Sequence, residues 1–220
     1  MTHVRRHSPR RLLALALALA LVGAVRCTSG PRPPTDTRPY AEQVQEARAR
    51  KDADFRAPDN PYSPVPANER ATFPGIRYYA IAPEYRIAAG LTELASNPPV
   101  VIALADSSHQ LQQKVKVGTL DFTLGGQTYK LSAFAESVGM IQRLWVPFRD
   151  LTSGIETYGG GRYLDLDRTA TGYYDLDFNK AYHPSCVYDP SWVCPYPPSE
   201  NRLPVAIRAG ERLPDSSATK

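Results

Sequence analysis

The chain has 220 residues, of which 42% are hydrophobic and 22% charged, and its formal net charge is +4. This length is enough for one hydrophobic core and short for two large domains. The charge does not indicate nucleic-acid binding, because five arginines precede residue 28 and no acidic residue does; the rest of the chain has 21 basic and 22 acidic residues. We therefore predict a single domain and no nucleic-acid partner.

The N-terminal segment predicts export. A basic head is followed by 14 apolar residues, 12–25, the length of a signal-peptide core and less than the roughly 20 residues of a membrane-spanning helix. Two interpretations of residues 1–27 stay open. Small residues at 22–24 suit cleavage and loss of the whole segment, whereas Cys27 suits lipidation of a bacterial lipoprotein, for which Arg26 is a poor fit. Both place the protein in the bacterial cell envelope, as a periplasmic protein or as a lipoprotein anchored to a membrane through Cys27.

The next segment predicts a tether and then a helix. Residues 28–39 are rich in Pro, Thr, Ser and Arg, so we expect them to stay disordered. Tyr40, Val44, Ala47 and Phe55 recur at helical spacing, with charged residues on the other faces, including Arg48 and Lys51. The pattern predicts one amphipathic helix over 40–55, and four prolines within 57–66 end it.

From residue 76 the periodicity changes from helical to alternating. Gly125 and Gly126 stand between two alternating runs, which is typical of a hairpin with a primed turn. Short strands about ten residues apart, without a second helical pattern, indicate a mainly β fold: an antiparallel sandwich or barrel-like domain with one N-terminal amphipathic helix. We predict a single β-rich domain over 40–213 and a disordered tail over 214–220. The expected strands, besides the hairpin, are 76–82, 85–94, 98–105, 143–148, 162–167 and 173–179.

The chain has no GxSxG, HExxH, Walker or GxGxxG motif. Polar residues instead gather within 149–165. A chain reversal at 152–154 would bring Arg149 and Asp150 close to Glu156 and Tyr158. Such clusters are more often structural ion pairs than active sites. Gly159 to Gly161 lack the lysine and the following helix of a phosphate loop, so we predict a tight bend there.

Cys186 and Cys194 are separated by seven residues, a spacing that fits neither structural zinc sites nor redox motifs. In an exported protein this pair predicts a disulfide. The nine-residue loop it closes would be stabilised by about 2.5 kcal/mol in the chain-entropy model. We predict no metal and no cofactor. The aromatic and proline residues of the loop favour a rigid lid, which could also contact a ligand.

The runs PFRDLTSGIETYGGGRYLDLD and DLDFNKAYHPSCVYDPSWVCPYPPSENRLPVAIRAGER resemble the bacterial and archaeal family called domain of unknown function 1684. KDADFR, YSP and FPGIRYY in the N-terminal half are similar to it as well, so the resemblance covers about residues 40–213. His183 departs from the family, which commonly has Asn or Ser there. The resemblance implies no biochemical role. It does point to candidate site residues, which with Arg149 are Asp150, Glu156, Tyr158, Arg162, Asn179, Tyr182, Glu200 and Asn201.

Two functions are compatible with these features. The first is an uncharacterised, non-catalytic binding or structural module of the cell envelope, whose partner is a small molecule or an envelope component. The alternative is a carboxylate-dependent hydrolase in which Glu156 or Glu200 works beside Arg162 and Tyr158. An enzyme would need several of these side chains to converge in a pocket, with one carboxylate desolvated and its pKa raised.

Overall fold

The computed structural model describes residues 36–96 and 98–213. The predicted signal peptide with Cys27, the tether up to residue 35 and the tail 214–220 lie outside these residues. The chain divides into two units after Arg38, and the fold below is that of the unit that begins at Pro39. In the described part of the chain, no helix has the length and apolar character needed to cross a membrane.

Helix α2 (Tyr40–Arg56) confirms the predicted helix and ends before Pro58, which disfavours a helical conformation at the preceding residue. Its inner face differs from the prediction, because Val44 is its one buried residue. Arg48, expected on a solvent-facing side, donates hydrogen bonds to the carbonyls of Tyr79 and Asn179. Charged side chains therefore attach this helix to the β structure more than apolar packing does.

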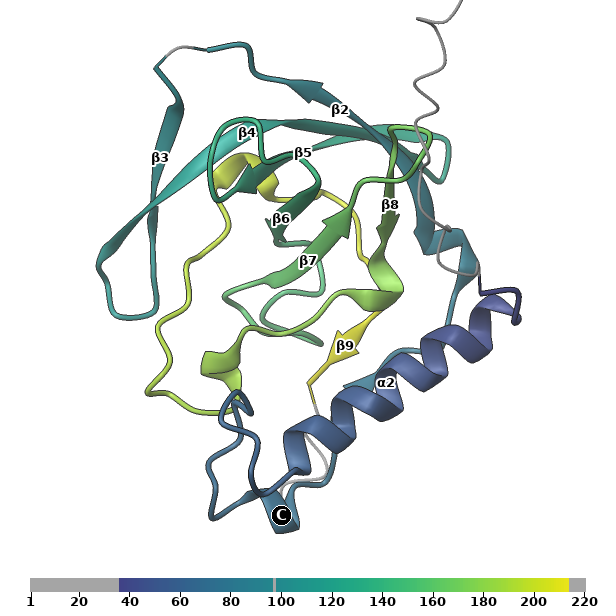
Figure 1. Cartoon of the computed structure of the whole chain (residues 1–220), viewed down its shortest axis with the longest axis vertical. Helices are drawn as coiled ribbons and strands as arrows, with labels where there is room; N and C mark the ends of the chain where they lie inside the picture. The colour runs from purple at the N-terminus through teal and green to yellow at the C-terminus, as the bar shows by residue number, and fades with distance from the viewer. Residues whose placement is uncertain (1–35, 97, 214–220) are drawn as a thin grey trace, which may run out of the picture. The chain divides into compact units, whose positions relative to one another are not determined.

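Seven strands form one antiparallel sheet in the order β7-β6-β5-β4-β2-β8, with β3 paired to β4 (Figure 1). An isolated bridge between Arg168 and Tyr174 links the outer strands of this order, so the sheet is a nearly closed barrel. This confirms the predicted fold class. The strands are β2 (Arg86–Glu93), β3 (Val100–Ala105), β4 (Leu111–Leu124), β5 (Gln127–Ala135), β6 (Arg143–Phe148), β7 (Arg162–Asp167) and β8 (Tyr174–Asp177).

The hairpin predicted at Gly125 and Gly126 joins β4 to β5, with Leu124 opposite Gln127. Both glycines have positive φ, 58° and 79°, as a primed two-residue turn requires. The first half of β4 extends beyond β5 and pairs with β3. Figure 1 shows this β3–β4 arm curving away from β6 and β7.

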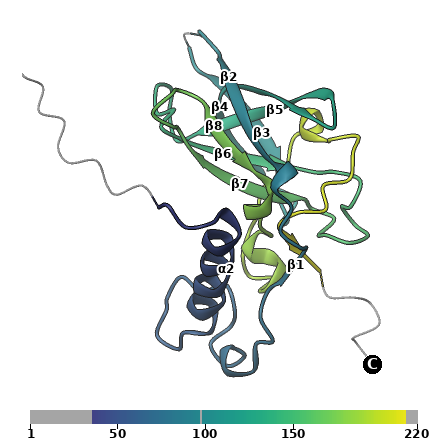
Figure 2. The same cartoon turned by 90° about the vertical axis from the view of Figure 1, so that its right-hand side faces the viewer.

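The strand predicted over 76–82 is much shorter in the structure. Only β1 (Arg77–Tyr78) forms, and it pairs with β9 (Glu211–Arg212). Beyond it, Ala82 uses its backbone N–H and C=O to pair with the side-chain amide of Asn179, at 2.9 and 2.8 Å. A side chain thus replaces a strand neighbour. Figure 2 shows β1 and α2 on the same side, below the large sheet.

Alternation along the strands separates a core from an outer aromatic row. On β6, Leu144, Val146 and Phe148 are fully buried in the barrel interior, which leaves Trp145 on the outer face. The row continues across neighbouring strands, with ring centroids 5.6 Å apart for Phe134 and Trp145 and 5.0 Å apart for Trp145 and Tyr163. The outer face of β5, β6 and β7 is therefore aromatic.

Strands β5 and β6 meet at a single residue pair, Phe134 and Trp145. On one side of that pair the side chain of Asn201 fills the gap. Its amide accepts from the N–H of Ser132 at 2.6 Å and donates to the carbonyls of Ser132 at 2.9 Å and Pro147 at 2.7 Å. Asn201 is completely buried, so its side chain connects the segment that follows the disulfide loop to strands β5 and β6.

The predicted disulfide between Cys186 and Cys194 is present. The loop it closes is attached to the turn after β3, since Ser107 donates its N–H to the carbonyl of Cys194 at 3.0 Å and accepts from the Cys194 N–H at 3.1 Å. Tyr196 donates to the carbonyl of Ala105 at 2.7 Å. The disulfide loop is consequently attached to the turn end of the β3–β4 arm.

Candidate functional site

Asp150 and Arg162 form a buried ion pair at one end of the barrel. Arg162 Nη2 lies 2.7 Å from Asp150 Oδ2, and the two side chains are 1% and 0% exposed. The guanidinium also donates to the carbonyls of Ile207, Ala209 and Glu211. Because these three carbonyls belong to residues 207–211, the pair attaches this segment to the barrel.

Glu156 lies outside this pair. The predicted reversal at 152–154 does form, with Gly154 donating to the carbonyl of Thr157, but it turns Glu156 toward Arg208 at 2.8 Å and the hydroxyl of Tyr79 at 3.0 Å. The hydrogen bond from Arg208 lowers the pKa of Glu156, against a smaller opposing effect of burial. A carboxylate held ionised in this way is poorly suited to act as a general acid.

Glu200 lies on the far side of the C-terminal segment, beside Lys116 at 3.4 Å and the hydroxyl of Ser132 at 3.2 Å. Burial alone would raise its pKa, but hydrogen bonds from its own backbone N–H, from Lys116 and from Ser132 lower the pKa overall. Neither candidate glutamate has the raised pKa that the hydrolase alternative requires.

The other candidate residues mainly hold backbone or rings in place. Asn179 and Asn201 pair with main-chain groups, as described above. Arg149 stacks on Tyr196, with its guanidinium carbon 5.3 Å from the ring centroid. Tyr158 is partly buried, which raises its pKa. The side chains proposed from the sequence therefore have different partners: Asp150 and Arg162 pair with each other, the two glutamates pair with separate bases, and the two asparagines pair with the main chain.

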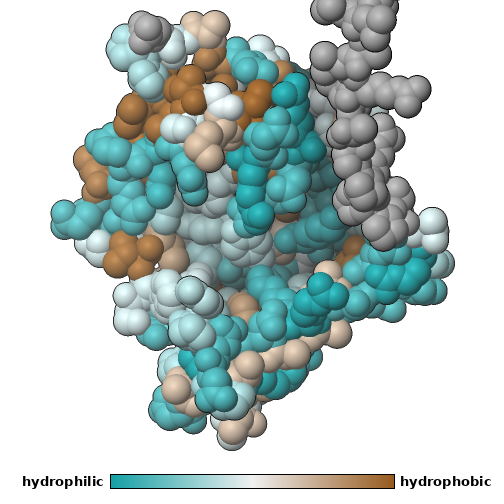
Figure 3. Space-filling model, in the orientation of Figure 1, coloured by the Kyte–Doolittle hydropathy of each residue, from teal (hydrophilic) through white to brown (hydrophobic). Residues whose placement is uncertain are grey.

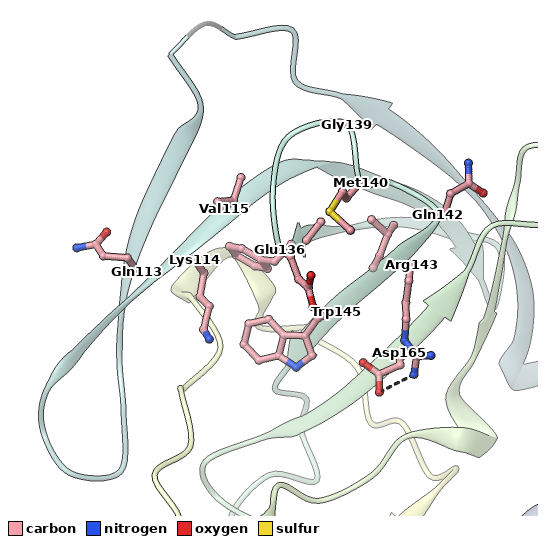
Figure 4. A pocket seen from close by; sticks show the side chains of 13 residues that line it. Gln113, Lys114, Val115, Glu136, Gly139, Met140, Gln142, Arg143, Trp145 and Asp165 are labelled. Carbon is pink, nitrogen blue, oxygen red and sulfur yellow. Dashed lines mark ion pairs between the residues drawn. The ribbon is translucent and has the colours of Figure 1, made fainter.

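A cavity of about 760 Å³ lies elsewhere, where the β3–β4 arm, the loop between β5 and β6, and β6 itself meet. In Figure 4 the indole of Trp145 is seen nearly face-on, with Lys114, Glu136 and the Arg143–Asp165 pair on three sides of it. The apolar part of the lining includes Val115, Phe134, Ala135, Met140 and Leu144. We refer to this cavity as the Trp145 pocket. In Figure 3 the face that carries β6 and β7 is hollowed above α2.

The indole of Trp145 is fixed from two sides. The ring of Phe134 packs against it tilted by 56°, and Tyr163 contacts it edge-on at 77°. Lys114 Nζ lies over the indole, 5.6 Å from the ring centroid, within the range of a cation–π interaction. These contacts hold a large aromatic ring in one orientation beside the cavity.

The charges around Trp145 are balanced and only partly paired. Arg143 and Asp165 form an ion pair at 3.5 Å with exposed side chains, and Asp165 also accepts from the hydroxyl of Tyr182 at 3.0 Å. Across residues 36–96 and 98–213, Lys114 and Glu136 have no ion-pair partner. Two charged groups of opposite sign are therefore available to a ligand.

Comparison with protein families bears directly on these residues. A family model described as "Protein of unknown function (DUF1684)" matches residues 71–212, well over half of the chain. The chain belongs to the DUF1684 family. The match includes every residue of the Trp145 pocket and both cysteines of the disulfide. It begins after α2, so the similarity of KDADFR and YSP lies before the matched residues.

A solved structure supports the same assignment. The chain is 37% identical to an uncharacterised protein of Haloarcula marismortui whose solution NMR structure is known, with a TM-score of 0.59. The match covers 78% of this chain and 93% of that one. Among curated proteins no significant match is found. This DUF1684 protein therefore shares its fold with that uncharacterised protein.

The Trp145 pocket of this DUF1684 protein was not predicted from the sequence, although one signal for it exists. In RLWVPF the residues at 144, 146 and 148 take the core positions, so Trp145 must lie on the opposite face. A tryptophan on the face of a strand that points away from the hydrophobic core is a candidate ligand contact. Lys114 and Glu136 carry no comparable signal, because only the folded β4–β5 hairpin brings them close to Trp145.

His183 of this DUF1684 chain is buried beside the ion pair rather than in the pocket. The backbone N–H of His183 donates to Glu211 Oε2 at 2.7 Å, and its ring Nε2 accepts from the backbone N–H of Tyr158 at 3.3 Å. Burial lowers the pKa of His183 to about 3, and the positive charges of Arg162 and Lys51 contribute. Within the described ranges, no group of three or more His, Cys, Asp or Glu side chains is placed to hold a metal.

The depressed pKa of His183 predicts a loss of stability in acid. Between pH 6.5 and about 3 the unfolded chain binds a proton at His183 and the folded chain does not. The contribution of neutral His183 is therefore complete above pH 6.5 and falls as the pH drops below it. In His183→Asn, the slope of unfolding free energy against pH over pH 4–6 should be smaller by up to one proton, about 1.4 kcal/mol per pH unit.

Urea unfolding of both proteins at several pH values measures this slope. The exposed His109 provides the control, and His109→Asn should keep the parent slope; asparagine also tolerates the positive φ of 63° found there. Equal slopes for the parent and His183→Asn would show that His183 is not kept neutral by the fold.

Proposed function

We propose that this DUF1684 protein is an exported, non-catalytic binding module of the cell envelope that takes a small molecule in the Trp145 pocket. The observation that carries the proposal is the fixed indole beside a cavity of about 760 Å³. Ligand sites are typically cavities of this size, largely apolar, with a few placed polar groups. The pocket combines an apolar lining with Lys114 and Glu136, which are available for hydrogen bonds.

Localisation in the envelope is supported by the basic head and the 14-residue apolar run of the sequence. Cleavage before the tether would release the module into the periplasm, and lipidation of Cys27 would hold it at a membrane with residues 28–39 as the spacer. In both cases the partner is a small molecule or a component of the envelope. The hydrolase alternative is not favoured, because Glu156 and Glu200 each have a basic partner and a lowered pKa.

Native mass spectrometry of the protein purified from its own envelope tests this proposal. We expect a retained small molecule on the parent protein and on Trp192→Ala, and at least a tenfold smaller bound fraction on Trp145→Ala. Trp192 is the matched control, since it is the other tryptophan of the chain and lies 41% exposed in the disulfide loop. A bound fraction that is unchanged in Trp145→Ala, or no bound molecule on any of the three proteins, would contradict the proposal.

A further inference from the structure

The Trp145 pocket also indicates the chemical class of its ligand. The assignment of this class rests on the function proposed above. The rings of Phe134 and Tyr163 fix Trp145, and Figure 4 shows the indole face directed out of the page beside the cavity. An aromatic face carries partial negative charge, so it attracts groups with polarised hydrogens. The face is also apolar, so a ligand that covers it displaces water. A saturated ring that presents C–H groups on one face matches this platform.

The polar groups around the platform exclude a ligand with a large net charge. Two positive side chains, Lys114 and Arg143, face two negative ones, Glu136 and Asp165, so their formal charges cancel. A phosphate or polycarboxylate ligand would be repelled by one half of this set, whereas phosphate sites use an excess of Arg, Lys or backbone N–H groups. A cationic ligand beside the indole would be repelled by the ammonium group of Lys114, which lies over the ring. A neutral ligand is therefore favoured.

The same four groups suit hydroxyls. Lys114 and Arg143 only donate hydrogen bonds, and the carboxylates of Glu136 and Asp165 only accept them, whereas a hydroxyl can do both. A ring with several hydroxyls can therefore satisfy donors and acceptors placed on different sides of one aromatic face. Gln113 and Gln142 point away from the indole in Figure 4 and lie at the margin of the pocket. There they could contact a neighbouring ring of a longer ligand.

From this geometry we propose that the pocket binds a neutral saccharide, with one sugar ring stacked on Trp145 and its hydroxyls bonded to Lys114, Glu136, Arg143 and Asp165. The hollow on this face in Figure 3 is open to the outside, so the ring can belong to a longer glycan as well as to a free sugar. The shared chemistry is the uncharged, polyhydroxylated ring.

Tryptophan fluorescence provides the test. The chain has two tryptophans, so Trp192→Phe leaves Trp145 as the sole reporter. This variant is titrated with maltotriose, cellotriose and triacetylchitotriose, with the corresponding monosaccharides, with trigalacturonic acid and with dialanine. We expect a saturable change in emission with at least one neutral trisaccharide. A tighter complex with the trisaccharide than with its monosaccharide indicates a glycan, and equal affinities indicate a free sugar.

Calorimetry on variants then assigns the platform. Trp145→Ala should bind the active saccharide about tenfold more weakly, and Trp145→Phe, which keeps a smaller ring and the fold, should bind with an intermediate affinity. Glu136→Gln should weaken binding a few-fold, because the amide is a poorer acceptor than the carboxylate. The parent affinity in Trp145→Phe would contradict stacking on the indole.

The failure of this inference can be told apart from the failure of the proposed function. Saturation by trigalacturonic acid alone would overturn the neutral charge of the ligand. Saturation by dialanine alone would overturn the saccharide and leave a ligand site at Trp145. Saturation by none of the probes, with a molecule other than a saccharide retained on the parent protein in native mass spectrometry, would do the same. No response to any probe, together with no retained molecule, would overturn both.

Discussion

Replacing Arg162 with methionine is expected to lower the free energy of unfolding by about 3–5 kcal/mol, the usual cost of removing one partner of a buried ion pair. Methionine has a similar length but no donor. Asp150, whose side chain is 0% exposed, would be left as an uncompensated buried charge, and the carbonyls of Ile207, Ala209 and Glu211 would lose their donor. Urea unfolding followed by circular dichroism measures the change.

Arg143→Met is the matched control for Arg162→Met. Arg143 pairs with Asp165 from the neighbouring strand at 3.5 Å, but the two side chains are 67% and 38% exposed. Exposed pairs contribute about 0–1 kcal/mol, so this variant should stay within about 1 kcal/mol of the parent. If the two variants lost stability equally, the Arg162 network would not be what joins residues 207–211 to the barrel.

Asn201→Ala should destabilise the protein by at least about 3 kcal/mol. The substitution leaves three buried main-chain groups without a partner: the N–H and C=O of Ser132 and the C=O of Pro147. Each unsatisfied buried group costs about 1–3 kcal/mol. Because Asn201 fills the gap between β5 and β6, amide hydrogen exchange at Ser132 should also become faster relative to the rest of β5.

Two further variants define the cause of that loss. Asn201→Asp keeps an acceptor for the Ser132 N–H but has no donor for the two carbonyls, so it should be destabilised while Ser132 stays protected from exchange. Asn60 is the control, since it also makes two side-chain hydrogen bonds with the main chain, at a partly exposed turn. Asn60→Ala should cost about 1 kcal/mol. A loss in Asn201→Ala no larger than in Asn60→Ala would show that Asn201 is not integral to the sheet.

The parts of the fold that could be predicted are those with local causes. The helix over 40–56, the turn at Gly125 and Gly126 and the alternating strands each follow from neighbouring residues in the sequence. Two departures have non-local causes. Arg48 faces inward because carbonyls from distant segments accept its hydrogen bonds, and the strand predicted over 76–82 is cut short because Asn179 pairs with Ala82.

The candidate site could be predicted much less well. Family motifs drew attention to Asn179, Asn201 and Arg162, and the structure places all three in hydrogen-bond networks with the main chain. Residues of a family motif can therefore stabilise the fold through main-chain hydrogen bonds instead of forming a catalytic or binding site. The Trp145 pocket is formed by the curvature of the β3–β4 arm and by the loop after β5. No local sequence pattern predicts either of them.

The proposed ligand site of this DUF1684 protein is the Trp145 pocket, and the polar residues around Glu156 are the competing location. The most direct measurement is two-dimensional NMR of the ¹⁵N-labelled protein, titrated with a small-molecule extract of its native envelope. We expect shifts of the Trp145 indole N–H and of the backbone amides of Lys114, Glu136 and Arg143. Shifts confined to Glu156, Tyr158 and their neighbours would contradict it.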